Sequence, residues 1–167
     1  MNHTTTIHSA CKEAPDAPGC VPPADIPIAE LIRSARKARQ KAYAPYSGYM
    51  VGAAVLTNEL RIYTGCNIEN ASYTPSLCAE RTAISKAVSE GWRRFRAIAI
   101  VGSPKGDAIT QYAYPCGVCR QVIREFAAPG QFFVIVAREE EDYKIFTLEE
   151  LLPESFGPEN LTGNVES

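Results

Sequence analysis

The residues of this sequence whose types and spacing could do chemistry are cysteines. Two of them, Cys116 and Cys119, stand three positions apart in the stretch YPCGVC. This spacing fits three kinds of site: a redox-active dithiol, half of a structural zinc knuckle, or two ligands of a catalytic metal ion. Which of these it is depends on the other ligands that the chain can bring to the pair.

Counting the possible metal ligands narrows the choice. Both histidines, His3 and His8, lie in the first 24 residues, a stretch rich in Thr, Pro, Ala and Asp that we expect to be a disordered tail. A folded metal site therefore has to use cysteine or carboxylate ligands. The other cysteines outside that tail are Cys66, which we interpret as a buried structural thiol, and Cys78.

Cys78 is expected at the beginning of one helix, and Cys116 and Cys119 in the first turn of another. The N-terminus of a helix favours the thiolate, which is the form that binds metal. Three protein thiolates leave an open position on a tetrahedral zinc ion, as in sites that activate water. Glu80 can stand beside such an ion only if the helix starts near Cys78, and we expect it to be a base rather than a ligand.

Composition sets the context for this site. With 167 residues, of which 46% are hydrophobic, the chain suits one compact domain, expected at residues 25–161, with a C-terminal tail at 162–167. A net charge of −2 argues against a nucleic-acid partner and favours a small, soluble substrate. No stretch approaches the roughly 20 apolar residues of a membrane span, and the N-terminus lacks the apolar core of a secretion signal. We therefore expect a cytoplasmic protein without a membrane partner.

The elements that must position the cysteines follow from hydrophobic periodicity. A first helix is expected over residues 25–43, capped by Asp25, with a basic, solvent-facing side that carries Arg33, Lys37 and Lys41. Strands alternate with helices after an opening hairpin, and this order predicts an α/β fold: a three-layer α-β-α sandwich with a mixed, about five-stranded sheet. The strands are expected at 49–57, 61–68, 95–102, 131–137 and 142–147, and the further helices at 77–90, 116–127 and 148–152.

The sequence also resembles a known family. The blocks YAPYSGYMVGAAVLT, GCNIENASY, CAERTAI, PCGVCRQVIREF and ELLPESFGPENL are similar to those of the small homotetrameric, zinc-dependent cytidine deaminases with an all-cysteine zinc site. The resemblance runs from about residue 38 to residue 161 and so covers nearly all of the expected domain. It implies the cytidine deaminase fold and one zinc ion per subunit.

The resemblance implies a role for each residue of the metal site. Cys78, Cys116 and Cys119 would hold the zinc ion, which would activate a water molecule. Glu80 would take a proton from this water and deliver it to N3 of the cytosine ring and then to the leaving amine. Arg81 would be the cation that hydrogen-bonds the thiolates and offsets their negative charge.

The resemblance also implies the substrate contacts. Asn67 and Glu69 would grip the ribose 3′-hydroxyl, which would select nucleosides over free bases and exclude nucleotides. The other substrate-binding positions include aromatic rings set against the pyrimidine and residues through which adjacent subunits of a homotetramer complete each other's sites. These positions are Tyr49, Ala71, Tyr73, Ala79 and Phe156, the last reaching the site from a neighbouring subunit.

Two local features add to this comparison. If the strand at 61–68 continues, Asn67 and Glu69 share one face while Ile68 points to the core. The stretch SPKGDAITQYAY, at residues 103–114, is longer than the corresponding family segment and is expected to alter the rim of the pocket.

The function expected from this resemblance is the hydrolytic deamination of cytidine and 2′-deoxycytidine to uridine and 2′-deoxyuridine, in pyrimidine salvage. Two alternatives share the metal: a deaminase of a modified cytosine nucleoside, and a non-catalytic zinc scaffold with Cys66 as the fourth ligand. A thiol-disulfide enzyme would use the Cys116 and Cys119 pair but would give no role to Cys78 and Glu80.

Overall fold

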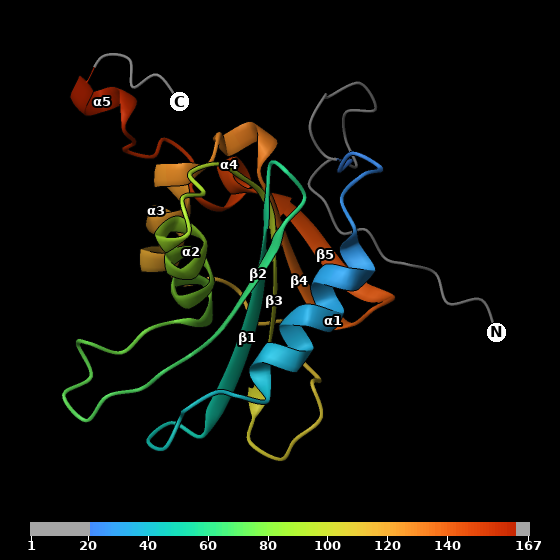
Figure 1. Ribbon diagram of the computed structural model, residues 1–167. Coiled ribbons are helices and arrows are strands. Elements are labelled where there is room, and N and C mark those ends of the chain that lie inside the picture. Colours follow the sequence, from blue (N-terminus) through green and yellow to red (C-terminus); the bar gives the residue numbers. More distant parts are fainter. Residues whose placement is uncertain (1–20, 163–167) are drawn as a thin grey trace.

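The computed structural model of the protein describes residues 21–162 as alternating helices and strands (Figure 1). The predicted tails, 1–24 and 162–167, lie outside this described part except for residues 21–24 and 162. The elements in chain order are α1 (Ile28–Arg39), β1 (Tyr49–Thr57), β2 (Ile62–Cys66), α2 (Ala79–Ser89), β3 (Phe95–Pro104), α3 (Gly117–Phe126), the short 3-10 helix η2 (Pro129–Gln131), β4 (Phe133–Glu139), β5 (Asp142–Thr147), α4 (Leu148–Leu151) and α5 (Glu159–Thr162).

The five strands form one mixed sheet in the order β2-β1-β3-β4-β5. The central strand β3 pairs parallel with β4; the other three neighbouring pairs are antiparallel. The parallel pair needs a crossover, and the chain makes it through α3. The predicted mixed sheet of about five strands is confirmed.

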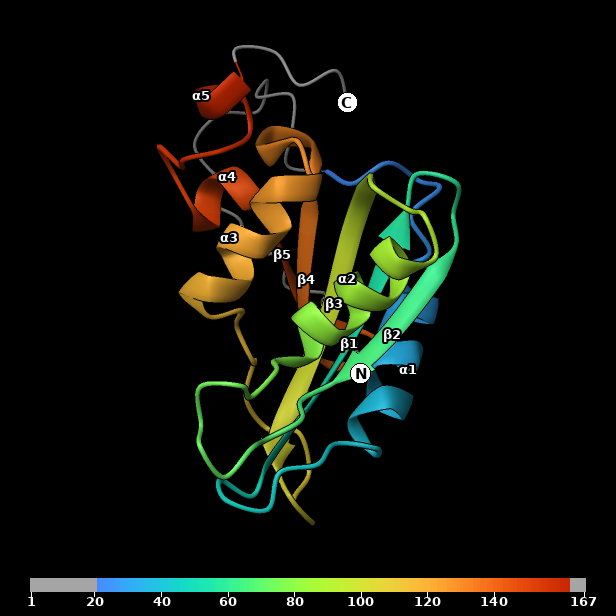
Figure 2. The same cartoon turned by 60° about the vertical axis from the view of Figure 1, so that its left-hand side comes forward.

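Helices cover both faces of this sheet. Residues that alternate along β1 and β3 point to opposite faces, as the pleat requires. Val55 and Ile98 pack in the core cluster that includes α2 and α3, whereas Leu56 and Ala97 pack in the cluster that includes α1. Figures 1 and 2 show α1 on one side of the sheet and α2 and α3 on the other. This arrangement is the predicted three-layer sandwich.

Two glycines of the sheet allow these helices to lie close to it. A Cβ atom at Gly52 would collide with the backbone of α1 at Ala35, and one at Gly65 would collide with the backbone of α2 at Ala83. Any larger residue at these positions would push the helix away from the sheet. The position of α2, whose first turn carries Glu80, therefore depends on a glycine in β2.

The first helix begins differently from the prediction. Its N-cap is Pro27, and no side chain caps it. Asp25 forms an ion pair instead with Arg96 of β3, with N–O distances of 2.6 and 2.9 Å. The expected capping role of Asp25 is therefore wrong, because its carboxylate accepts two hydrogen bonds from Arg96 and does not cap the helix.

The second strand also ends earlier than predicted. β2 stops at Cys66, and Ile68 has 41% of its surface exposed rather than pointing to the core. The backbone of Ile68 forms isolated bridges with Tyr43 and Leu77, so the chain leaves the plane of the sheet here. This departure places the following residues over the end of the sheet rather than along it.

One end of the sheet collects the connecting segments that matter for function. The loops at residues 40–48, 67–78 and 105–116 lie together at the lower end in Figure 1, and α2 and α3 both begin on that side in Figure 2. The short helices α4 and α5 lie at the opposite end. Within residues 21–162, every helix is too short or too polar to cross a membrane.

Candidate active site

Three cysteine thiols meet where α2 and α3 begin. Cys78 is the N-cap residue of α2, Cys116 is the N-cap residue of α3, and Cys119 follows in the first turn of α3. Their sulfur atoms lie within 4.8 Å of one another, and the Sγ atoms of Cys78 and Cys116 are 3.9 Å apart. Sulfur ligands at about 2.3 Å from one zinc ion lie roughly 3.8 Å from each other, so this cluster fits zinc.

Electrostatics also suit the thiols to a metal ion. The hydrogen bond from Cys119, assisted by Arg81, lowers the pKa of Cys78 to about 5, although burial opposes this shift. The pKa of Cys119 is raised, chiefly because its proton is held in the hydrogen bond to Cys78. The pair therefore already carries one negative charge at neutral pH, and a dication is the partner that such thiols accept.

Arg81 stands directly behind the cluster. Its Nη2 atom donates a hydrogen bond of 2.6 Å to the carbonyl oxygen of Ser76 and lies 3.9 Å from the Sγ atom of Cys78. Its Nε atom is buried and has no hydrogen-bond partner within residues 21–162. Burial lowers the pKa of Arg81, but the hydrogen bonds and charges of Cys78 and Cys119 together outweigh this effect and leave the pKa raised. A partly buried cation with a spare donor at the cluster suits three thiolates on one zinc ion.

Glu80 lies beside the thiols but does not join them. The cluster of possible metal ligands in the described part of the chain consists of the three cysteines alone. The side chain of Glu80 is buried, and burial raises the pKa of its carboxyl to about 7, with a smaller contribution from the charge of Cys78. A carboxyl with this pKa can both accept and give up a proton near neutral pH.

A cavity of about 620 Å³ opens over this cluster. Most of the residues predicted for the site line it, and they come from β1, from the segment between β2 and α2, from α2 and from the start of α3. They are Tyr49, Asn67, Glu69, Tyr73, Cys78, Ala79, Glu80, Arg81 and Cys116. Cys119 belongs to the metal cluster but is fully buried beneath the cavity. Ala71 and Phe156 do not line this cavity and lie exposed elsewhere on the chain.

Asn67 is held with its amide at the wall of the cavity. Its Oδ1 atom accepts a hydrogen bond from the backbone N–H of Val51, and its Nδ2 atom donates one to the carbonyl of Tyr49, both at 2.8 Å. An amide has two donor hydrogens and two acceptor lone pairs, so one of each remains for a ligand.

Glu69 is held in a similar way by the loop before β1. Its carboxylate accepts hydrogen bonds from the backbone N–H groups of Tyr46, at 2.8 Å, and Ser47, at 3.2 Å, and from the Ser47 hydroxyl. The hydroxyl contributes most to lowering the pKa of Glu69. A carboxylate has about four acceptor positions, so one remains for a ligand hydroxyl. Although the strand does not continue, the two side chains still reach one cavity.

Comparison with known proteins agrees with this geometry. Residues 27–135 match the family described as "Cytidine and deoxycytidylate deaminase zinc-binding region". A cytidine deaminase from Sporosarcina psychrophila is 45% identical over 135 residues, which are 81% of this chain and 95% of that protein. The chain belongs to the zinc-dependent cytidine deaminase family. This membership confirms the expected family, the hydrolase class and the zinc cofactor.

Solved structures give the same result for the fold. The crystal structure of cytidine deaminase from Burkholderia pseudomallei has a TM-score of 0.69 and 43% identity, and the match covers 76% of this chain and 97% of that one. Cytidine deaminase from Mycobacterium tuberculosis has a TM-score of 0.66 and 36% identity, with 80% and 99% covered. The predicted cytidine deaminase fold is therefore confirmed.

Several residues of the cavity were not identified from the sequence. Tyr112, Ala113 and Tyr114 form part of its wall, and the extra length of their loop was the one sequence feature that pointed to them. Tyr46 and Ser47 hold Glu69 but precede it by more than twenty positions. Contacts of this kind between loops leave no local pattern in a sequence.

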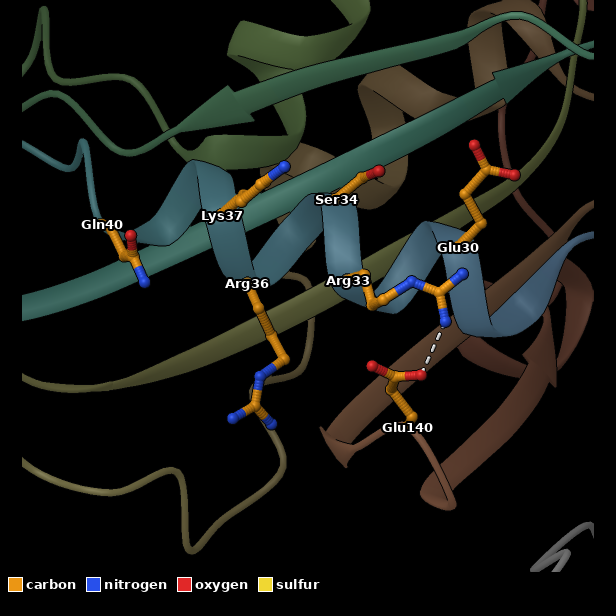
Figure 3. Close-up of a pocket in the computed structure, with 7 residues that line it drawn as sticks. All are labelled: Glu30, Arg33, Ser34, Arg36, Lys37, Gln40 and Glu140. Carbon is orange, nitrogen blue, oxygen red and sulfur yellow. Dashed lines mark hydrogen bonds and ion pairs between the residues drawn. The ribbon is translucent and has the colours of Figure 1, made fainter.

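A second hollow, of about 480 Å³, runs along the outer side of α1 (Figure 3). It includes Arg33 and Lys37 of the predicted basic stripe but not Lys41. Arg33 pairs with Glu140 at 2.7 Å, and the neighbouring Arg36 pairs with Glu139 at 2.5 Å. The side chains of Arg33 and Lys37 are exposed. This is the expected solvent-facing side of a helix, and the cluster of three thiols borders the other cavity.

Proposed function

We propose that this chain catalyses the hydrolytic deamination of cytidine and 2′-deoxycytidine to uridine and 2′-deoxyuridine, with release of ammonia. The observation that carries the proposal is the position of Glu80: a buried carboxyl, with a pKa near neutrality, in the same cavity as three thiols that can hold zinc. A structural zinc site would have no use for such a group. Among residues 21–162, the scaffold alternative also lacks a fourth ligand, because Cys66 is not in the cluster.

Zinc bound by the three cysteines would supply Lewis-acid activation of the attacking water. Glu80 would accept the proton that this water loses, since its carboxyl lies next to the thiols and is shielded from solvent. It would pass this proton to N3 of the cytosine ring, which keeps it in the product, and would then carry the second proton of the attacking water from the new C4 hydroxyl to the departing amine. The reaction consumes one water molecule and releases one ammonia molecule, so Glu80 ends in its starting protonation state.

Arg81 would keep the thiolate cluster from becoming too negative for this reaction. Three thiolates and a divalent ion carry one excess negative charge, which disfavours ionising the water. The guanidinium near Cys78 and the N-termini of α2 and α3 oppose that charge.

Asn67 and Glu69 would recognise the ribose. Their remaining hydrogen-bonding positions, one donor and one acceptor on Asn67 and one acceptor on Glu69, match a hydroxyl group that both donates and accepts. Because the carboxylate of Glu69 is negatively charged, a phosphate attached to that hydroxyl would be repelled. These contacts support a nucleoside substrate rather than a nucleotide, a free base or a nucleic acid.

We further propose a homotetramer whose subunits complete each other's cavities. Phe156, Ala71 and Tyr73 are exposed, with 56% and 71% of the surface accessible for Phe156 and Tyr73. Large exposed apolar side chains are typical of surfaces that another chain covers. A cytoplasmic location, a role in pyrimidine salvage and a deaminase domain at residues 25–161 belong to the same proposal.

The experiment that tests the proposal is a steady-state ultraviolet assay of zinc-quantified protein. Loss of cytosine absorbance is followed in parallel with cytidine, 2′-deoxycytidine, cytosine and cytidine 3′-monophosphate. Turnover of the two nucleosides alone is the expected result. If the protein binds one zinc ion per chain but turns over none of the four, cytidine deamination is wrong, and modified cytosine nucleosides become the substrates to assay.

A further inference from the structure

The wall of the cavity next to the metal cysteines comes from the loop between β3 and α3. Tyr112, Ala113 and Tyr114 of this loop line the cavity, and Cys116 follows after Pro115, at the start of α3. The loop has no helix or strand of its own, so its shape depends on contacts with the rest of the protein.

Tyr112 is fixed to the far edge of the sheet. Its hydroxyl donates a hydrogen bond of 2.5 Å to Oδ1 of Asp142, the first residue of β5. The Oδ2 atom of Asp142 accepts a hydrogen bond of 2.6 Å from Arg138 of β4. The same arginine donates to the carbonyl of Thr110 at 3.3 Å. The hydroxyl end of Tyr112 is thus held by a carboxylate whose other oxygen is also occupied.

The ring of Tyr112 is held by two cations. The guanidinium carbon of Arg138 lies 4.8 Å from the ring centroid, and the Nζ atom of Lys144 lies 4.7 Å from it. Both distances are within the range of cation–π attraction. The side chain therefore meets resistance to rotation at its hydroxyl and at its ring.

The rest of the loop is anchored at both ends. Arg39, the last residue of α1, donates hydrogen bonds to the carbonyl of Pro104, where β3 ends, at 3.0 Å, and to the carbonyl of Asp107 in the loop, at 3.5 Å. The ring of Tyr114 packs 5.9 Å from that of Phe146 on β5. A wall fastened to α1, β4 and β5 cannot easily retreat from a bulky ligand.

Gly102 shows how tightly this wall meets the other side of the cavity. A Cβ atom at this position would lie 2.9 Å from the Cβ atom of Ala113 and 3.0 Å from the ring of Tyr49. The side chains of Ala113 and Tyr49 therefore both pack against the backbone of Gly102, which has no side chain to keep them apart. Little empty space is left between the loop and Tyr49.

The proposed function determines which part of the substrate would face this wall. The reacting carbon C4 has to lie near the three thiols, the ribose near Asn67 and Glu69, and N3 near Glu80. The ring edge next to C4, on the side away from N3, is the one at C5. The anchored loop leads directly into the metal ligand Cys116 and lines the cavity, so this edge would face it.

We propose that Tyr112, held in place by Asp142 and Arg138, limits the size of the substituent that the cavity accepts at position 5 of the pyrimidine. Asp142 and Arg138 are positioning residues in this proposal, and Tyr112 is the residue that determines specificity. The proposal rests on the proposed function, because it requires cytidine to be a substrate.

The test compares kcat/KM for 5-methylcytidine with kcat/KM for cytidine in the zinc-loaded protein. Tyr112→Phe removes the hydroxyl, and Asp142→Asn weakens its acceptor. Each change should raise the ratio of 5-methylcytidine to cytidine by roughly tenfold, the lower end of what one methyl group is worth in a close-fitting pocket. The double variant should resemble the single variants, because both remove the same restraint.

Tyr63→Phe is the matched control. The Tyr63 hydroxyl also donates to a carboxylate, that of Glu90 at 2.7 Å, but neither residue lines the cavity. This variant should keep the wild-type ratio. Such a result would show that a changed ratio comes from losing the Tyr112–Asp142 hydrogen bond and not from losing any tyrosine–carboxylate hydrogen bond. Zinc content and Tm are measured for every variant, and if Tyr112→Phe fails to fold, Asp142→Asn still provides the ratio.

Two results overturn different claims. If wild-type protein deaminates cytidine but Tyr112→Phe and Asp142→Asn both keep the wild-type ratio, the loop does not set the limit at position 5. If wild-type protein deaminates no cytidine, the proposed function itself is wrong.

Discussion

The Nη2 atom of Arg81 lies 3.9 Å from the Sγ atom of Cys78, and one turn of α2 connects the two residues. This cation is fixed from the other side by its hydrogen bond to the carbonyl of Ser76. Its charge is therefore held at the metal cluster whether or not a substrate is present.

Arg81→Ala should weaken zinc binding by about 10- to 100-fold, since losing a partner that hydrogen-bonds a metal ligand has this effect in other sites. Arg81→Lys keeps the charge but not the guanidinium geometry. Its zinc affinity should lie between those of the wild type and Arg81→Ala. The measurement is zinc retained per chain over a series of chelator concentrations. The exposed Arg94, changed to Ala, is the control and should retain zinc as the wild type does. Equal retention by the Arg81→Ala variant and the wild type would show that the arginine does not support the metal.

Glu80→Gln should reduce turnover of cytidine by about 10²- to 10⁴-fold or more, because an amide cannot carry the proton. The same variant should keep one zinc ion per chain, since the cluster of possible ligands is made of the three cysteines. Steady-state kinetics and zinc quantification on the same sample check both expectations. Loss of zinc together with activity would contradict the assigned role and make Glu80 part of the metal site.

The metal cluster could be predicted because its causes are local. A cysteine at a helix start has the same environment wherever the helix lies, so Cys78 and Cys116 could be placed at helix N-termini, and the structure has both there. The strand at 49–57 was also predicted with its observed bounds, because a long apolar run of strand-forming residues specifies it without help from distant partners.

The failed predictions concern residues whose partners are far away in the chain. Asp25 has the type and position of a helix cap, but Arg96, 71 positions later, takes its carboxylate. Ile68 continues the alternation of a strand, but its backbone pairs with Tyr43 and Leu77 outside the sheet. The anchoring of Tyr112 by Asp142 belongs to the same class. Local sequence patterns indicate which contacts a residue could make. Only the three-dimensional fold shows which partner it contacts.

The ion pair of Asp25 with Arg96 predicts a pH-dependent stability. The hydrogen bond from Arg96 is the largest of the influences that lower the pKa of Asp25 below its ordinary value of 3.8, although burial acts in the opposite direction. A lowered pKa means that this carboxylate stabilises the folded state above pH 3.8 and that the contribution is lost as pH falls through the folded-state pKa. Asp25→Asn should therefore lower Tm at pH 7 and make progressively less difference below about pH 4.

Thermal melts of wild type and Asp25→Asn in parallel from pH 7 to pH 3 measure this. Acid also protonates the metal thiols, but it does so in both proteins, so the difference between the two Tm values isolates the ion pair. A Tm difference that stays constant over this range would contradict an electrostatic role for Asp25.

The contact of Glu69 with the ribose can be separated from its structural contacts by changing the substrate. Glu69→Gln keeps the shape of the side chain but loses its charge, and kcat/KM for cytidine should fall by about 10- to 100-fold, the effect of weakening a hydrogen bond to a charged group. With 3′-deoxycytidine, which lacks the proposed partner, wild type and Glu69→Gln should have nearly equal kcat/KM. Ser47→Ala, which removes a hydroxyl that holds Glu69, should give a smaller loss with cytidine. An equal loss with both nucleosides would show that Glu69 only supports the loop.

Phe156 provides a test of completion between subunits. The helix that carries two of the metal cysteines also holds the segment around this residue: Gln121 donates to the carbonyl of Phe156 at 3.0 Å, and Arg124 donates to Ser155 at 3.0 Å and pairs with Glu159. The backbone of the segment is thus fixed, while the ring of Phe156 is exposed and does not line the cavity of its own chain. If this ring contacts a substrate, as proposed, it must do so in the cavity of a neighbouring chain.

Phe156→Ala should therefore impair each site in a homotetramer of identical variants, mainly by raising KM. Glu80→Gln abolishes the chemistry of its own chain but leaves its Phe156 intact. Co-expression of the two variants with different affinity tags, followed by purification through both tags, gives mixed oligomers. In these, some cavities combine an intact Glu80 with an intact Phe156 from a neighbour, so kcat/KM for cytidine should exceed that of either variant alone. If the mixed oligomers are no more active than Phe156→Ala on its own, the ring does not complete a neighbour's cavity, and its exposure has another cause.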